Sequence, residues 1–322
     1  RGPGGGAAGA RRAALRAAPG RGFPDGFDWA RPASRVWDGG LAPSEHADAG
    51  EVRELVRREG FAVLRGVLRR ELVDACARRF QGLLESRYRS IAGAPNRGRM
   101  RHYLVVQPRG PFLSGAAALG SSRLRAVLAG VLGADFAAHQ LAVDVNLPGS
   151  EFQPMHADIP RRVDRCPGHD AAREDPALLC VNFPLVDVND TNGPLEIVPG
   201  SQHAAAWDVE ARLQEGSMQL VRVHVKRGDA VLRDLRALHR GSPNPSSSPR
   251  PMAVCGFARA GAVFGKLRQG HRRPASDGEL FDAAFMSHIA VREEDWERLS
   301  EAQRRALRLV PLRRSQGGRK KK

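Results

Sequence analysis

LAVDVNLPGSEFQPMHAD, residues 141–158, contains the pattern that decides the fold. Its first seven residues have the composition of a short strand, and the Pro148-Gly149 pair is a turn signal that ends it. His156 and Asp158 follow two residues apart, so their side chains project from the same face of an extended segment. A strand, a turn and a same-face polar pair in this order indicate a β structure with a functional site at a strand end.

The same pattern of short strands separated by turn residues continues downstream of residue 158. Short apolar runs separated by Gly, Pro, Asn and Asp residues occupy 178–183, 195–198, 220–225, 230–232 and 252–257. Many short strands separated by turns are typical of an antiparallel sandwich or jelly roll. We therefore expect a mainly β fold.

Helical spacing of apolar residues appears on both sides of the β region. It occurs at 51–59, 72–84 and 123–132, and again at 279–289 and 293–309, while residues 61–64 have the composition of a short strand. The sequence therefore predicts a β core at about 136–260 with an N-terminal helical layer and C-terminal helices at about 277–310. We expect one domain, 49–312, between an irregular N-terminal arm (1–48) and a basic tail (313–322).

The net charge of +16 resides mainly at the two ends of the chain. Residues 1–22 contain five Arg and residues 313–322 contain six Lys or Arg, with no acidic residue in either, which leaves +5 for residues 23–312. Solvated arms explain this distribution better than an anionic partner such as nucleic acid or a membrane surface. We interpret a further basic group before the core as solvated loop charge, with contact to an anionic substrate as the alternative: Arg99, Arg101, His102 and Arg109.

Cysteine usage and hydropathy bear on the compartment. The four cysteines, Cys76, Cys166, Cys180 and Cys255, include no C-x-x-C pair and indicate a reducing environment rather than a disulfide framework. No uninterrupted apolar stretch approaches the roughly 20 residues of a membrane span. A cytoplasmic protein fits these features best, while the Arg- and Ala-rich opening leaves organelle targeting as an alternative.

Two imidazoles and one carboxylate can hold one face of an octahedral Fe(II) and leave three positions open, which is the ligand set of non-haem iron oxygenases. His156 and Asp158 supply one imidazole and the carboxylate, and His239, which follows the strand at 230–232, is the candidate for the other imidazole. Arg250 begins the last core strand, where an inward-pointing guanidinium needs an anionic partner such as a dicarboxylate; a salt bridge to a protein carboxylate is the alternative. The other eight histidines are not expected to be ligands: His46, His102, His139, His169, His203, His224, His271 and His288.

At these residues the chain resembles the phytanoyl-CoA dioxygenase family of Fe(II)/2-oxoglutarate oxygenases. The resemblance runs from about Val52 to Arg259 and is carried by GFAVLRGVLRRELVD (60–74), HAD (156–158), NGPLEIVPGSQH (192–203), GDAVLRDLRALHRGSPN (228–244) and RPMAVCGFAR (250–259). It implies a double-stranded β-helix core, which is a cupin-like jelly roll. It also implies His156, Asp158 and His239 as iron ligands and Arg250 as the residue that binds the distal carboxylate of 2-oxoglutarate.

The same resemblance suggests further residues beside the co-substrate. Asn182 occupies a position where the family often has an aromatic side chain. Some members have a hydroxyl two residues after the second ligand His, but here that position is Gly241, and Ser242 is one residue further. Gln153, just before the first ligand, is a further candidate for binding the co-substrate.

The resemblance implies a dioxygenase that uses Fe(II), 2-oxoglutarate and O2, with ascorbate as a potential stimulant, to hydroxylate a small-molecule or acyl substrate with release of succinate and CO2. Halogenating relatives lack the carboxylate ligand so that chloride can bind, and Asp158 fills that position, which favours hydroxylation. One alternative is a catalytically silent member that binds a partner through its pocket or basic tails, but it gains nothing from the retained ligands. A second is a zinc hydrolase, which would leave Arg250 without a role and lacks a Glu beside either His.

Overall fold

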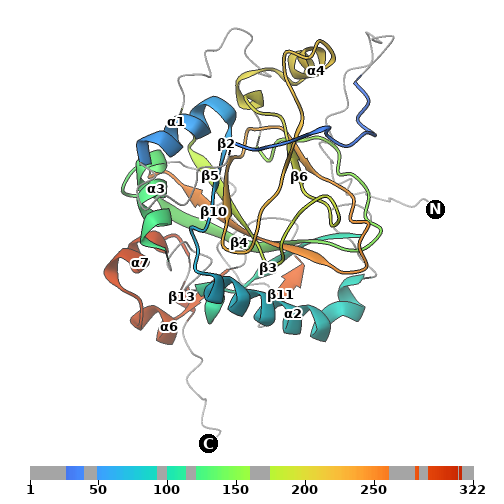
Figure 1. Cartoon of the computed structure of the whole chain (residues 1–322). Helices are drawn as coiled ribbons and strands as arrows, with labels where there is room; N and C mark the ends of the chain where they lie inside the picture. The colour runs from blue at the N-terminus through green and yellow to red at the C-terminus, as the bar shows by residue number, and fades with distance from the viewer. Residues whose placement is uncertain are drawn as a thin grey trace, which may run out of the picture.

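Two sheets face each other at the centre of the protein (Figure 1). The larger has seven strands in the order β11-β3-β4-β10-β5-β8-β2, and the smaller has four in the order β1-β7-β6-β9. Their strand pairs are antiparallel except for β1–β7, which confirms the predicted jelly roll.

This computed structural model describes residues 27–39, 49–92, 100–113, 121–159, 175–260, 280–282, 289–310 and 312–313. The strands are β1 (Arg35–Val36), β2 (Phe61–Leu64), β3 (Arg101–Val106), β4 (Ala137–Asn146), β5 (Leu178–Pro184), β6 (Leu195–Ile197), β7 (Val221–Val223), β8 (Ala230–Asp234), β9 (His239–Gly241), β10 (Arg250–Ala258), β11 (Leu280–Asp282), β12 (Val291–Arg292) and β13 (Leu312–Arg313).

Helices pack on the outer face of the seven-stranded sheet (Figure 1). Those that contribute buried apolar residues to this layer are α1 (Ala49–Glu59), α2 (Arg70–Ala92), α3 (Ser122–Leu132) and α7 (Glu301–Ala306), and Trp296 of α6 (Glu293–Glu297) packs against it. A further helix, α4 (Ala206–Gln214), follows a short 3-10 turn, η4 (Ser201–His203).

The predicted N-terminal helices are confirmed, and their ends have local causes. Gly60 ends α1 with a φ of 80°, a left-handed conformation that favours glycine, and its N–H donates to the carbonyl of Val56 at 2.9 Å. Ser121 caps α3 because its hydroxyl accepts from the N–H of Leu124 at 3.1 Å, and Gly133 closes the same helix as the sequence predicts.

Strand alternation divides each strand of the large sheet between two environments. Along β10, Ala253 and Cys255 pack with the helices, whereas Met252 and Val254 face the space between the sheets. The same alternation places Arg233 of β8 on the inner face. The inner face is therefore where polar side chains of the strands can meet a ligand.

The sheet extends beyond the core range that the sequence indicated. Residues 101–106 form β3 in the middle of the sheet, so Arg101 and His102 are buried rather than part of a solvated loop. Residues 280–282 form β11 against β3 rather than starting a helix, and residues 283–288 lie outside the described residues. The pattern at 293–309 forms two short helices instead of one.

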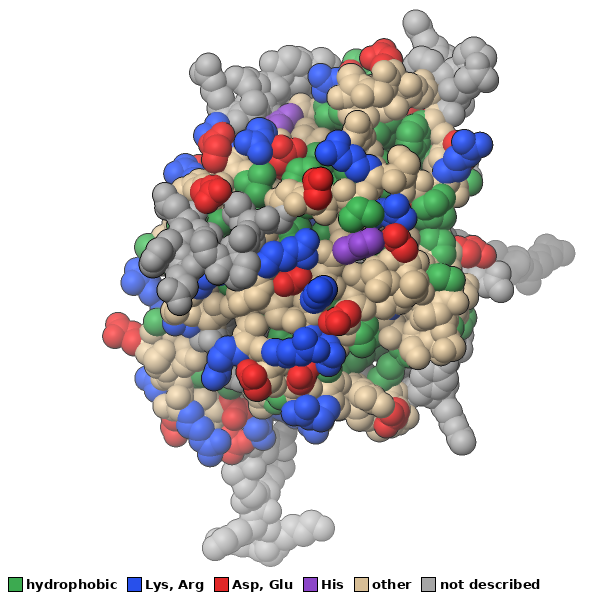
Figure 2. Space-filling view, in the orientation of Figure 1, with side chains coloured by type: hydrophobic (Ala, Val, Ile, Leu, Met, Phe, Trp, Pro, Cys, Tyr) green, Lys and Arg blue, Asp and Glu red, His purple; other side chains and the backbone are tan. Residues whose placement is uncertain are grey.

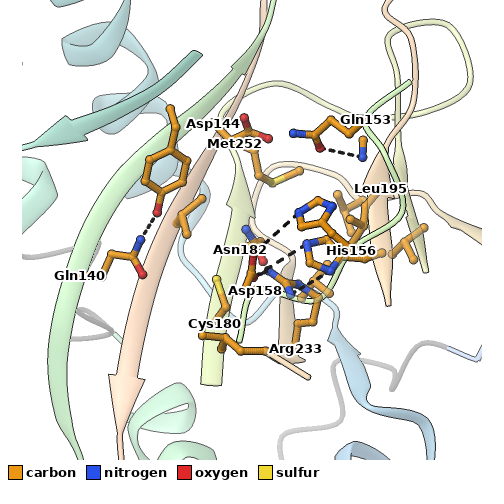
Figure 3. A pocket seen from close by; sticks show the side chains of 18 of the residues that line it. Gln140, Asp144, Gln153, His156, Asp158, Cys180, Asn182, Leu195, Arg233 and Met252 are labelled. Atoms are coloured by element: carbon orange, nitrogen blue, oxygen red, sulfur yellow. Dashed lines mark hydrogen bonds and ion pairs between the residues drawn. The ribbon is translucent and has the colours of Figure 1, made fainter. Parts of the chain in front are cut away.

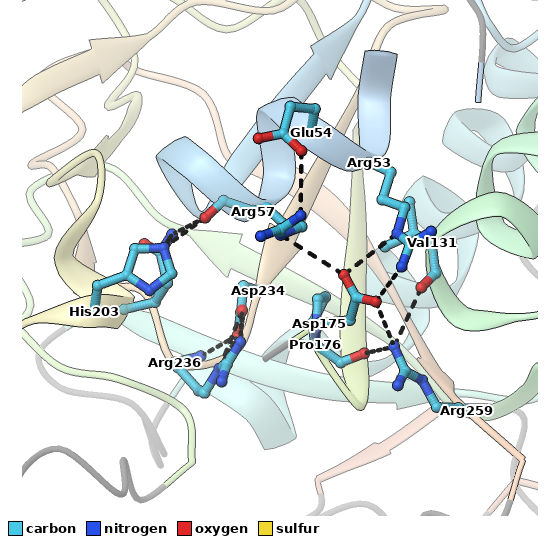
Figure 4. A network of polar contacts seen from close by, with 11 residues as sticks. Arg53, Glu54, Arg57, Val131, Asp175, Pro176, His203, Asp234, Arg236 and Arg259 are labelled. Carbon is cyan, nitrogen blue, oxygen red and sulfur yellow. Dashed lines mark hydrogen bonds and ion pairs between the residues drawn. The ribbon is translucent and has the colours of Figure 1, made fainter. Parts of the chain in front are cut away.

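A polar network fastens α1 to the β core (Figure 4). Asp175, just before β5, forms ion pairs with Arg53 and Arg57 of α1 and with Arg259 after β10. Burial raises the pKa of Asp175, but hydrogen bonding to Arg53 and the charges of the three arginines outweigh it, so the pKa lies below its usual value. The pairs keep this carboxylate ionised between the helix and the sheet.

On the face shown in Figure 2, acidic and basic side chains are interspersed. This distribution agrees with the small net charge of residues 23–312. Among the described residues, no helix combines the length and the apolar character that crossing a membrane requires.

Candidate metal centre

The segment that contains His156 lies along strand β9 and is held there by backbone hydrogen bonds. The N–H of His156 donates to the carbonyl of His239 at 3.1 Å, and the N–H of His239 donates to the carbonyl of His156 at 2.9 Å. Gln153 strengthens the pairing, since its Oε1 accepts from the N–H of Gly241 at 2.9 Å. The pairing sets the two imidazoles side by side, with ring centroids 4.4 Å apart.

Asp158 completes a group of three potential ligands. Its N–H donates to the carbonyl of Leu235 at 2.9 Å, which turns the side chain toward the imidazoles. Oδ1 lies 3.8 Å from Nε2 of His156, and Oδ2 lies 3.8 Å from Nε2 of His239. One ligand atom from each residue lies within 4.8 Å of the others. The fold thus brings together the three residues that the sequence singled out.

The backbone orients both imidazoles as ligands. Nδ1 of His156 lies 2.8 Å from the carbonyl oxygen of Pro154, and Nδ1 of His239 lies 3.0 Å from that of Ala237. When Nδ1 carries the proton and donates it to these carbonyls, Nε2 keeps a lone pair for a metal. In both residues Nε2 is the nitrogen that faces Asp158.

Arg233 sets the charge balance of the group. Its side chain is 6% exposed, and its NH2 donates to Oδ2 of Asp158 at 2.6 Å. Burial raises the pKa of Asp158, but the charge and the hydrogen bond of Arg233 outweigh burial, so this pKa lies well below its usual value. Burial, together with Arg233, lowers the pKa of His239. An ionised carboxylate and a neutral imidazole are the protonation states that metal binding needs.

The ligand atoms open into a cavity between the two sheets (Figure 3). Apolar side chains from both sheets form most of its wall, with a few polar groups among them, as is typical of small-molecule sites. Beside the three ligands and Arg233, the lining residues are Tyr103, Gln140, Asp144, Gln153, Ile159, Cys180, Asn182, Leu195, Val223, Val225, Val231, Leu235, Gly241, Arg250, Met252 and Val254.

Arg250 lies in this cavity at the first residue of β10, where it pairs in register with Asn146 of β4. It is 3% exposed, and no described residue forms a hydrogen bond or an ion pair with its guanidinium. Burial lowers the pKa of Arg250, and the charge of Asp144 raises it. Since a buried cation is costly without an anionic partner, this guanidinium is suited to a ligand carboxylate.

Asp144 of β4 is the carboxylate closest to Arg250 in the sheet register. It pairs with Met252, two residues along β10 from Arg250, and it points toward the same cavity. Its Oδ1 is buried and has no hydrogen-bond partner in the described part of the chain. The sequence reading missed this residue, which strand alternation alone could have placed on an inner face.

Arg101 of β3 pairs in register with Asn146 of β4, on the opposite side of β4 from Arg250. Its guanidinium donates to the carbonyl of Glu151 at 3.0 and 2.8 Å. Burial lowers the pKa of Arg101 to about 10; Asp144 opposes and Arg250 adds to this shift. Arg101 therefore contributes positive charge beside Arg250.

The other co-substrate candidates differ in position. Asn182 lines the cavity, and its Oδ1 is buried without a hydrogen-bond partner among the described residues. Gln153 also lines it, but its Oε1 already binds Gly241. Ser242 is buried and is not one of the described residues that line the cavity. A Cβ at Gly241 would lie 2.5 Å from NH1 of Arg101, so the space that a hydroxyl side chain would need at this position is filled.

The remaining histidines that the structure describes lie elsewhere. His224 faces outward and pairs with Asp190 at 2.9 Å, and Nε2 of His203 contacts the backbone carbonyl of Arg57. His102 and His139 are buried away from the ligand group. Four others lie outside the described residues: His46, His169, His271 and His288.

A family model described as phytanoyl-CoA dioxygenase (PhyH) matches residues 56–252. The chain belongs to the phytanoyl-CoA dioxygenase family. Solved structures with a similar fold include the non-haem α-ketoglutarate-dependent carbocyclase SnoK from nogalamycin biosynthesis, at 22% identity and a TM-score of 0.53, over 71% of this chain and 94% of that one. HygX from Streptomyces hygroscopicus, with nickel and 2-oxoglutarate bound, matches at 17% identity and a TM-score of 0.51, over 66% of this chain and 87% of that one.

The site of this phytanoyl-CoA dioxygenase family member fits Fe(II) and 2-oxoglutarate. Two imidazoles and one carboxylate suit a ferrous ion that must keep open positions. The guanidinium of Arg250, which no described residue hydrogen-bonds, lies at another part of the same cavity and suits the distal carboxylate of a dicarboxylic acid.

Proposed function

We propose that this protein is an Fe(II)- and 2-oxoglutarate-dependent dioxygenase that hydroxylates a small molecule or acyl substrate and releases succinate and CO2. One observation carries the proposal: three convergent metal-ligand side chains share a single cavity with a buried arginine that has no hydrogen-bond or ion-pair partner among the described residues. The metal side chains alone would also suit other metalloenzymes. The arginine adds the requirement for a bound anion.

Each residue has a distinct part in this proposal. His156, Asp158 and His239 hold the metal, and the carbonyls of Pro154 and Ala237 keep the two imidazoles in the ligating orientation. Bound iron, 2-oxoglutarate and oxygen supply the oxidising chemistry, while the protein supplies geometry and charge.

The other residues bind and shield the co-substrate. Arg250 binds its distal carboxylate, with Asn182 as a candidate polar contact beside it. Apolar residues such as Leu195, Val231 and Met252 limit the access of water to this space.

Hydroxylation is the outcome that we favour among the reactions open to this fold. Similar structures include a carbocyclase and, at 21% identity and a TM-score of 0.50, the epimerase SnoN, so the fold does not choose the reaction. Asp158 supports hydroxylation over halogenation, because it occupies the ligand position that halogenating relatives leave for chloride.

The two alternatives fit the cavity less well. A silent binding protein would not need an ionised Asp158 and two imidazoles oriented by the backbone. A zinc hydrolase would leave the buried guanidinium of Arg250 without a bound carboxylate, and no described residue hydrogen-bonds to it. Metal analysis of anaerobically purified protein separates iron from zinc.

The decisive experiment measures succinate release and oxygen uptake with Fe(II), 2-oxoglutarate and ascorbate, with and without candidate substrates. We expect turnover in the wild type and its loss in His156→Ala and Asp158→Ala. The matched control is His224→Ala, which removes an outward-facing imidazole that also pairs with an aspartate. Turnover that survives in the two ligand variants, or no turnover and no iron binding in the wild type, would overturn the proposal.

A further inference from the structure

Arg233 is a buried arginine in direct contact with the ligand carboxylate. It lies on β8 between Leu232 and Asp234, and its side chain faces the cavity between the sheets. Its guanidinium contacts Oδ2 of Asp158 at 2.6 Å and Nδ1 of His239 at 3.2 Å. These are two of the three potential metal ligands, although neither lies on the same strand as Arg233.

The contact between Arg233 and Asp158 engages one oxygen only. NH2 donates to Oδ2, while Oδ1 lies on the side of His156, 3.8 Å from its Nε2. Nearby Arg236 holds its own carboxylate differently, because its Nε lies 3.1 Å from both oxygens of Asp234 and its NH2 lies 2.7 Å from Oδ2 (Figure 4). Asp158 is therefore anchored through one oxygen, and its other oxygen stays available.

The number of carboxylate oxygens on the metal decides how many positions stay open. An octahedral metal held by two imidazoles and one oxygen keeps three positions, two for 2-oxoglutarate and one for a diatomic gas. If both oxygens of the carboxylate bound the metal, 2-oxoglutarate would fill the last two positions. A hydrogen bond from a guanidinium to Oδ2 uses one lone pair of that oxygen and draws electron density from it, which disfavours this second mode.

We propose that Arg233 is a positioning residue that keeps Asp158 a one-oxygen metal ligand, with Oδ2 held by the guanidinium and Oδ1 left for the metal. The inference rests on the proposed function, since it concerns the same metal and co-substrate. Contact with His239 does not oppose it. When Nδ1 of His239 donates to the carbonyl of Ala237, it offers Arg233 no acceptor, and Asp158 is the carboxylate that Arg233 contacts.

The test uses nitric oxide as a probe for an open metal position, in anaerobic full-length protein with Fe(II) and 2-oxoglutarate. The visible absorption of the ferrous–2-oxoglutarate chelate shows that both have bound, and electron paramagnetic resonance measures the nitric oxide adduct. We expect Arg233→Met to form the chelate but to bind nitric oxide about tenfold more weakly than the wild type, the lower end of the usual effect of losing a partner of a metal ligand. Arg233→Lys, which can still donate to Oδ2, should restore much of the binding.

Arg236→Met is the matched control, because it removes a partly buried arginine from Asp234, an aspartate two residues away on the chain that is not a ligand. It should bind nitric oxide as the wild type does. Wild-type binding of nitric oxide in Arg233→Met would overturn the inference and assign Arg233 a structural role. Loss of iron binding in that variant would also overturn it, since Arg233 would then govern metal affinity rather than the mode of binding.

A measurement on the wild type covers the case in which Arg233→Met does not fold. A crystal structure loaded with Mn(II) and 2-oxoglutarate should show only Oδ1 of Asp158 at bonding distance from the metal, and both oxygens at that distance would overturn the inference. A wild type that forms no ferrous–2-oxoglutarate chelate would instead contradict the proposed function itself. The two failures are therefore distinguishable.

Discussion

Arg240 and Arg250 lie ten residues apart and are equally buried, at 1% and 3% exposure, but their surroundings differ. Arg240 points outward from β9 and is fully engaged: it donates to Glu196 at 2.7 Å, to the backbone carbonyls of Trp29 and Arg31, and it stacks on the ring of Phe152. Arg250 points into the cavity and has no partner among the described residues.

The difference indicates that Arg240 stabilises the fold, whereas Arg250 is available to bind a ligand. Arg240 and Glu196 attach the N-terminal lead-in to the small sheet, since Oε1 of Glu196 also accepts from the N–H of Ala33 at 2.7 Å. An internal pair of this kind contributes to folding whether or not a ligand is present. A buried guanidinium without an internal anion costs stability and is retained for binding.

Removing the carboxylate partner of Arg240 should have the largest effect on stability. Glu196→Ala leaves this guanidinium buried without an anion, so we expect the free energy of unfolding to fall by about 3–5 kcal/mol. Urea denaturation measures the change. Asp208→Ala is the control, because its exposed pair with Arg212 should contribute no more than about 0.5 kcal/mol. Equal losses in the two variants would show that the Arg240 site is not structural.

Arg250→Met should weaken the binding of 2-oxoglutarate. Losing the charged contact to a carboxylate costs about 2–3 kcal/mol, which weakens 2-oxoglutarate binding about 100-fold. The affinity for Fe(II) should stay unchanged, because Arg250 is not among the ligand residues. Calorimetry on the anaerobic iron-loaded protein measures both affinities.

The control for this affinity is Arg259→Met, which removes a half-exposed arginine just after the end of the same strand. It should bind 2-oxoglutarate as the wild type does. Unaltered co-substrate affinity in Arg250→Met would assign the distal carboxylate to another residue, with Arg101 as the nearest cation in the strand register.

The sequence could predict the parts of the site that depend on short spacing and on strand ends. His156 and Asp158 share a face because they are two residues apart, and His239 and Arg250 follow or begin strands that their composition reveals. The jelly roll followed from the number of short strands between turns.

The contacts that regulate these residues could not be predicted, because they depend on register between distant strands. Arg233 meets Asp158 across 75 residues, and no local pattern links them. Residues 103–106 have the composition of a strand, but no local pattern shows that 101–106 pairs with β4 and buries Arg101. Likewise, the strand at 280–282 forms because β3 offers an edge, which is a tertiary cause.

The comparison of the two arginines also predicts that the apoprotein gains stability when Arg250 is replaced. Arg250→Met exchanges a buried charge that has no hydrogen bond or ion pair within the described residues for an apolar side chain of similar length, so the free energy of unfolding without ligands should rise by about 1 kcal/mol. Thermal or urea unfolding in the presence of a chelator measures it. A loss of stability would mean that the guanidinium supports the fold after all, and the contrast with Arg240 would fail.

The smallest expected effect concerns Asp144, whose charge acts on Arg250 from the adjacent strand. This carboxylate repels a dianionic co-substrate bound to the same guanidinium, so Asp144→Asn should tighten 2-oxoglutarate binding by about 1 kcal/mol, the scale of a like-charge pair that water partly screens. The gain, about fivefold, should shrink as salt concentration rises.

Asp190→Asn is the control for this variant, since it removes an acidic charge that pairs with Arg222 and His224 away from the cavity. It should leave the affinity for 2-oxoglutarate unchanged. Weaker binding in Asp144→Asn would show that Asp144 orients the guanidinium for its ligand. Arg250 would then resemble Arg240 in having a protein carboxylate that fixes its position, and the contrast between a structural and a binding arginine would become one of degree.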